Sequence, residues 1–270
     1  MDHNLRFALL SAGGALLLFI LMLTFVEIGR RFGRRQLSKY GEASRVGVGV
    51  VDSAVYSLLG LLVGFAFSGA AGRFDKRREM VAHQVNAIST AWQRIDLISP
   101  AKQPAIRDGF RQYLDALLAA YDHPAGSPGE LRARGNLTSA QDAIWSQVIP
   151  MSLSPEDDKA RMLVVPSVNE MFDAVDSERL AQRLHPPNLI YVMLILTALA
   201  GALFAGYAVS KVDRHNWTYT VGFTATVALA LFVTLELESP RLGWIRIDRT
   251  DDMLLEVRQR MDAPDPTAQR

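Results

Sequence analysis

The sequence predicts an all-α membrane protein with four transmembrane helices and a helical insert outside the bilayer. Charged residues make up 21% of the 270-residue chain, yet four long windows are almost free of them. Apolar residues between the windows recur at helical spacing, and signals for β-strands are weak throughout. A helix rises about 1.5 Å per residue, so the ~30 Å hydrocarbon core of a bilayer needs roughly 20 apolar residues. Each window has this length.

The four predicted membrane helices are residues 7–28, 46–72, 189–210 and 218–237. The charged residues inside these windows are Glu27, Asp52 and Glu236. Buried helices of soluble proteins rarely stay uncharged over such lengths, so we interpret the windows as membrane helices. The basic cluster near the first window follows the apolar run, which favours a retained helix over a cleaved signal peptide.

Basic residues flank the membrane windows on both sides. The stretch 30–45 carries six basic residues and one acid, whereas only Arg6 and Asp2 lie ahead of the first window. The positive-inside rule then favours an amino terminus outside the membrane and the loop after the first window in the cytoplasm. Basic residues also follow the second and fourth windows, so the opposite orientation stays open.

Residues 73–188 are predicted to form the helical insert. Its first apolar residues recur at steps of four and three, typical of a buried helical seam: Val81, Val85, Ile88, Trp92 and Ile95. No proline interrupts residues 46–98, so the second membrane helix is expected to continue into the insert. Further helices are expected over 106–121, over 139–148 and after Ser154, which is followed by proline and two acids. Residues 123–129 are expected to form a loop.

The tail, residues 238–270, is predicted to begin outside the membrane and to contain one short helix. The amphipathic pattern runs through Met253, Leu254, Val257 and Met261. A disordered end is expected from about Ala263 onwards, where prolines and polar residues replace the apolar pattern.

The composition argues against several classes of function. The formal net charge is only +1, which gives no large field to attract nucleic acid. The absence of cysteine excludes thiolate metal sites and cysteine nucleophiles. The five histidines show no metal-ligand spacing, and no catalytic motif lies between a strand and a helix. We therefore expect no enzyme, no metal site and no cofactor.

The second membrane window carries the candidate site. Small and polar residues repeat along one side, and Gly60 and Gly64 form a Gly-xxx-Gly pair that permits close helix approach in lipid. One interpretation is ordinary helix packing. The other is that several copies of this helix line a pore, with Phe65 or Phe67 as an apolar constriction. The predicted pore-lining residues are Asp52, Ser53, Ser57, Gly60, Gly64 and Phe67.

Arg73, Arg77 and Arg78 follow the second window directly. They are predicted to form a basic collar at the mouth of the pore, where they would attract anions. The alternative is that these residues anchor the helix to anionic lipid at the membrane surface. Both interpretations remain open at this point.

Two separated blocks resemble a known family. Residues 58–68, 73–78 and 86–94 are similar to the signature of a bacterial family of membrane proteins with a bestrophin-like domain, and residues 236–246 are similar to its second block. Gln84 and Trp92 depart from the commoner Glu and Tyr. The motif residues that we carry forward are Asn86, Arg94, Pro240, Arg241, Gly243 and Arg246.

The resemblance implies a function and a topology. Bestrophins are pentameric ion channels whose pore is lined by the second membrane helix, with both termini in the cytoplasm. That topology is opposite to the one that the Arg-rich stretch 30–45 favours. We therefore expect an oligomeric ion channel of a bacterial inner membrane, with small inorganic ions and membrane lipid as partners and no nucleic acid. The alternative is a non-conducting scaffold or signalling component that binds a partner through its insert.

Overall fold

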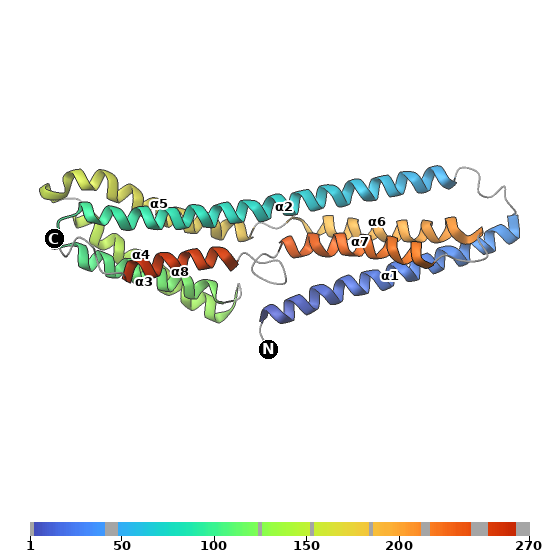
Figure 1. The fold of residues 1–270 in the computed structure, drawn as a ribbon, viewed down its shortest axis with the longest axis horizontal. Coiled ribbons are helices and arrows are strands. Elements are labelled where there is room, and N and C mark those ends of the chain that lie inside the picture. The colour runs from blue at the N-terminus through green and yellow to red at the C-terminus, as the bar shows by residue number, and fades with distance from the viewer. Residues whose placement is uncertain are drawn as a thin grey trace. The chain divides into compact units, whose positions relative to one another are not determined.

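The computed structural model describes residues 3–40, 48–123, 126–151, 154–183, 186–211, 217–238 and 248–262, and every regular element in these ranges is helical (Figure 1). The prediction of an all-α fold is confirmed. The eight α-helices within these ranges are α1 (His3–Tyr40), α2 (Val48–Arg94), α3 (Gln103–Tyr121), α4 (Pro128–Met151), α5 (Asp158–Arg183), α6 (Asn188–Ala208), α7 (Trp217–Glu238) and α8 (Asp248–Asp262).

The chain divides into two compact units. The membrane unit comprises residues 1–75 and 185–246, and the insert unit comprises residues 76–184 and 247–270. Four helices, α1, α2, α6 and α7, are long and apolar enough to cross a membrane. Helix α2 is one uninterrupted helix whose first part belongs to the membrane unit and whose last part belongs to the insert unit, as the absence of proline predicted (Figure 1).

Helices α1 and α6 approach each other closely in the membrane unit. A Cβ added to Gly29 would overlap the backbone carbonyl of Leu203, and one added to Gly206 would overlap the carbonyl of Val26. Only glycine permits two backbones to come this near. The surrounding core is apolar and consists of Met22, Val26, Leu59, Leu194, Ala198, Ala202 and Leu231.

The insert unit has its own hydrophobic core. The predicted seam contributes to it, since Val85 and Ile88 of α2 and Ile95 just after α2 are buried in this core and Trp92 packs against it. Val81 of the seam is also buried. Phe110 of α3 and the partly buried Trp92 lie with their ring centroids 6.1 Å apart. The heptad spacing read from the sequence therefore identifies the buried face of this part of α2.

Two local predictions in the insert need correction, and the helix expected after Ser154 is present. Helix α4 begins at Pro128, well before the predicted start at 139, because Ser127 Oγ accepts the Glu130 N–H and Glu130 accepts the Gly126 N–H. This arrangement is a variant of the capping box, because Glu130 accepts the N–H of the residue before the N-cap, and proline occupies the first helical position. Two residues of the expected loop are therefore helical. Helix α5 is preceded by the short 3₁₀ turn η3 (Pro155–Asp157) and continues through Pro166 without ending.

The amphipathic tail helix exists and belongs to the insert unit. Leu254, Val257 and Met261 of α8 are buried in the insert core, whereas Met253 is 40% exposed. Arg258 Nε of α8 donates to Asp115 of α3 over 2.7 Å. The end predicted to be disordered lies outside the described residues.

Candidate functional site

One exposed face of α2 carries small residues in the membrane unit. Ser53, Ser57, Gly60 and Gly64 are exposed, and Phe67 is 44% exposed. They follow one another at steps of four and three, so they line one side of the helix. A Cβ built on Gly60 or Gly64 would meet nothing within 4 Å. The Gly-xxx-Gly pair is therefore not used to pack α2 against another described helix of the same chain.

Two predicted site residues lie away from this face. Asp52 is 7% exposed and lies one residue before Ser53, which turns it about 100° around the helix. It shares the inner side of α2 with Leu59, which is part of the core. Phe65 is 68% exposed but is turned by about 100° from Gly64. Thus five of the six predicted pore-lining residues share a face, and only Phe67 of the two predicted constriction residues lies on it.

The three arginines of the predicted collar have different environments. Arg73 donates to the carboxylate of Glu238 from Nε over 2.9 Å and also from Nη2. Arg77 is 3% exposed, and Arg78 is exposed. The three guanidinium groups therefore differ in burial and in partners.

Buried carboxylates at the end of α7 form a polar cluster in the membrane unit. Glu236 is fully buried and accepts a hydrogen bond from Ser11 Oγ of α1 over 2.6 Å. Glu238 is 5% exposed and accepts the Arg73 guanidinium of α2. Their partners are far away in the sequence, so spacing alone could not identify them.

The described family-motif residues differ in their contacts. Asn86 is exposed on α2. Arg94 donates from Nη1 to the carbonyl of Leu163 over 2.9 Å, which joins the end of α2 to α5. The other four motif residues, Pro240, Arg241, Gly243 and Arg246, lie outside the described residues.

Gln84 has a structural reason for departing from the commoner Glu. It is fully buried, and its Nε2 lies 2.9 Å from the hydroxyl of Tyr121. That hydroxyl also lies 3.2 Å from the carboxylate of Glu178, which is 2% exposed. A second carboxylate at position 84 would place two acids in one buried network, which is costly. The neutral amide avoids that cost.

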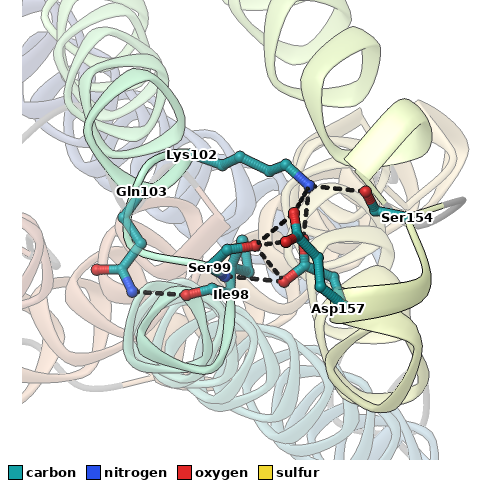
Figure 2. Close-up of polar contacts among 7 residues, drawn as sticks. Ile98, Ser99, Lys102, Gln103, Ser154 and Asp157 are labelled. Carbon is teal, nitrogen blue, oxygen red and sulfur yellow. Dashed lines mark hydrogen bonds and ion pairs between the residues drawn. The ribbon is translucent and has the colours of Figure 1, made fainter.

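Ser99, Lys102 and Asp157 form a second polar cluster, where the end of the α2 seam meets the start of α5 (Figure 2). Asp157 is 2% exposed and accepts the Ser99 N–H over 2.8 Å, the Ser99 hydroxyl and the Lys102 ammonium. Lys102 also donates to Ser154 and to Glu156. The Ser154 hydroxyl therefore accepts a hydrogen bond from Lys102, and it does not cap the following 3₁₀ turn η3.

The charges in this cluster favour a structural role. The hydrogen-bonded carboxylates of Asp157 and Glu156 raise the pKa of Lys102, so its ammonium is held protonated and is a poor general base. Burial acts to raise the pKa of Asp157, but hydrogen bonds from Lys102 and Ser99 outweigh it and lower that pKa below its ordinary value. Ser99 therefore lies beside a charged carboxylate, and the neighbouring lysine is protonated and cannot activate the Ser99 hydroxyl as a base.

Asp157→Asn should destabilise the insert unit by about 2 kcal/mol at pH 7, because it leaves buried donors poorly matched. The lowered pKa means that the stabilisation from Asp157 is present above its unfolded pKa of about 3.9 and is lost as the pH falls through its folded value. The wild type should therefore approach the variant on acidification. Thermal unfolding in detergent at pH 7 and at pH 3 measures this. Asp158→Asn, at an exposed neighbour, is the control, and an equal loss there would contradict the assignment.

No group of three or more His, Asp or Glu side chains in the described ranges is arranged to hold a metal ion. Glu79 and His83 line a shallow open groove in the insert unit with Lys76, and His83 Nε2 lies 3.1 Å from the carboxylate of Glu170. Glu79 and Glu170 are largely solvated, as expected for acids on amphipathic helices.

Comparisons with known proteins identify a family and related structures for this chain. The bestrophin-like domain family matches residues 16–252. Crystal structures of a bacterial bestrophin homologue from Klebsiella pneumoniae, each with one mutation, share the fold. One has a TM-score of 0.64 at 16% identity and covers 92% of this chain and 96% of its own. Two others have TM-scores of 0.66 and 0.65 at 15% and 17% identity; each covers 90% of this chain, and 98% and 97% of their own chains.

A search of curated proteins found no match. The family match covers most of the chain, including three of its four candidate membrane helices in full and most of the first. The solved structures share the fold over 92% and 90% of this chain. The protein is therefore a membrane protein that belongs to the bestrophin-like family.

Proposed function

We propose that the protein forms an oligomeric ion channel in which several copies of α2 surround a pore. The observation that carries this proposal is the exposed face of Ser53, Ser57, Gly60, Gly64 and Phe67. A Cβ built on either glycine would meet no atom of the described residues within 4 Å, so the described part of the chain leaves this face uncovered there. Small residues permit close helix approach and a narrow opening. Membership of the bestrophin-like family supports this choice.

Phe67 is the constriction of the proposed pore. It is the large apolar residue on the small-residue face, and a ring of such side chains would gate by excluding water. Phe65 lies off that face, and Asp52 lies on the inner side of α2, so neither is retained as a pore residue. Four membrane helices of one chain are too few to enclose a pore and seal it from lipid. A homo-oligomer is therefore part of the proposal.

The basic collar of Arg73, Arg77 and Arg78 gives the proposed channel a preference for anions. These residues follow the membrane part of α2 directly in the sequence. A ring of arginines beyond a narrow constriction attracts anions and repels cations. Arg78 is exposed, so it is the collar residue that the test below substitutes.

We place the protein in a bacterial inner membrane with its amino terminus outside, as the basic stretch 30–45 favours. Because the chain has no cysteine, single introduced cysteines report sidedness without background. Ser38→Cys lies on the exposed end of α1, and Ser139→Cys lies in the insert unit. A membrane-impermeant thiol reagent applied to intact spheroplasts should label Ser139→Cys alone. Labelling of Ser38→Cys alone would establish the opposite orientation.

A non-conducting scaffold is the second candidate function. It is favoured by apolar side chains that the insert unit exposes, namely Leu131, Met162 and Leu180, which are 63%, 75% and 61% exposed. A partner protein that binds the insert would cover them. A pore requires a closed ring of fixed size, whereas a scaffold does not. Native mass measurement of the detergent-solubilised protein separates the two.

Reconstitution into liposomes tests the channel directly. We expect ion flux above that of empty liposomes and a reversal potential set by the anion gradient. Arg78→Glu should move the reversal potential towards that of the cation, since it inverts the charge at the pore mouth. Arg132→Glu, at an exposed arginine of α4, should leave it unchanged. The absence of flux in several salts would contradict the channel, and an unchanged potential in Arg78→Glu would contradict the anion preference alone.

A further inference from the structure

The last turns of α1 carry an uncompensated positive charge. Residues 30–40 contain five basic side chains and no acidic one. Glu27 accepts hydrogen bonds from Arg30 and Arg31 over 2.8 Å and 2.7 Å. Arg34, Arg35 and Lys39 are exposed, and no described carboxylate lies within ion-pair distance of them. Among the described residues, Glu27 is therefore the acid that pairs with this stretch, and it pairs with two of the five cations.

Exposed aromatic side chains lie at the same end of the membrane unit. Phe32 and Tyr40 of α1 are 57% and 58% exposed. Ser11, near the start of α1, contacts Glu236 at the end of α7, so the two helices are antiparallel and the start of α7 lies towards the end of α1. That start carries Trp217, which is 51% exposed, and Tyr219 beyond it.

The length of α1 brings this end to a membrane surface. The helix has 38 residues, which at about 1.5 Å each exceeds the ~30 Å hydrocarbon core. Exposed apolar side chains, Leu17 and Ile20 among them, cover the preceding part of α1. Apolar surface for acyl chains, an aromatic zone and a cationic end therefore follow one another along the helix. Aromatic residues at this position are typical of the headgroup level of a bilayer.

We propose that this end of the membrane unit binds the headgroups of anionic phospholipids. We call it the cationic rim, and it consists of Arg31, Arg34, Arg35 and Lys39 with Phe32, Tyr40, Trp217 and Tyr219. Guanidinium groups hold phosphate oxygens in a bidentate manner, and the aromatic rings occupy the zone between headgroup and acyl chain. The continuity with apolar surface selects a lipid over a free anion. The proposal does not depend on whether the protein conducts ions.

Native mass spectrometry of the full-length protein with added lipid tests the rim. The wild type should retain phosphatidylglycerol in preference to phosphatidylcholine. The variant Arg34→Gln/Arg35→Gln/Lys39→Gln should lose about tenfold or more of this preference, since three cations near the headgroups are removed. The control Arg132→Gln/Lys159→Gln/Arg161→Gln removes the same charge from exposed positions of the insert unit and should keep the preference.

Further measurements keep the proposal open to refutation. If the rim variant is not recovered folded, the wild type alone should lose its preference for phosphatidylglycerol as salt is raised, because exposed charges are screened. Equal binding of both lipids by the wild type, or an unchanged preference in the folded rim variant, would overturn the proposal. Displacement of the lipid by equimolar inorganic phosphate would also overturn it, since the surface would then be a free-anion site.

Discussion

Gly206→Ala is expected to destabilise the membrane unit by about 3 kcal/mol or more. The added Cβ would overlap the backbone carbonyl of Val26, and backbone atoms of two long helices cannot move aside as a flexible side chain can. The helices α1 and α6 would have to separate, which would also open the close approach of Gly29 to Leu203. Thermal unfolding of the purified protein in detergent measures the loss.

Gly222→Ala is the matched control for this substitution. Gly222 lies in α7, and a Cβ there would meet nothing within 4 Å. Alanine favours a helix over glycine by about 1 kcal/mol, so this variant should be as stable as the wild type or slightly more stable. The two identical chemical changes are thus expected to have opposite signs. Equal melting temperatures of Gly206→Ala and the wild type would show that α1 and α6 do not approach closely.

Gly64→Leu is expected to remove most of the ion flux. Gly64 lies on the exposed face of α2 between Gly60 and Phe67, and a leucine on every copy would fill the proposed opening. Each 1.4 kcal/mol added to the barrier for permeation lowers the flux about tenfold, so even partial occlusion is measurable. The rate of ion flux from loaded liposomes gives the comparison with the wild type.

The control for Gly64→Leu must separate blocking from misassembly. Gly222→Leu adds the same side chain to an open position of α7 and should conduct normally. Native mass measurement should show the same oligomer for both variants. If Gly64→Leu does not assemble, Gly64→Ala provides the smaller change and should reduce the flux partially. Undiminished flux through a correctly assembled Gly64→Leu oligomer would exclude a pore lined by this face.

Features that depend on local pattern were predictable from the sequence. The lack of proline in residues 46–98 predicted that α2 continues beyond the membrane window, and the steps of four and three identified Ile88 and Ile95 as core residues. Such features depend on the helical period and on backbone chemistry, which a single sequence contains. The start of helix α4 was also predictable, because Ser127 and Glu130 have the spacing of a capping box.

Features that depend on the tertiary arrangement were not predictable. Arg73 pairs with Glu238, 165 residues later, and nothing in either local sequence indicates the other. The contacts of the three collar arginines likewise depend on which helices surround α2, so the sequence alone could not give them. The placement of Asp52 was different. Its offset of one residue from Ser53 already turns it about 100° away, so helical geometry alone was sufficient to separate the two.

Helix α8 completes the core of the insert unit although it is synthesised after the two membrane helices α6 and α7. Leu254, Val257 and Met261 cover apolar side chains of a core whose other helices precede α6 and α7 in the chain. During translation, α6 and α7 are therefore synthesised after α3 and before α8, the helix that packs on the insert core. During that interval the apolar side chains that α8 later buries are exposed, and a chain that ends before α8 would keep them exposed and would be expected to aggregate more readily.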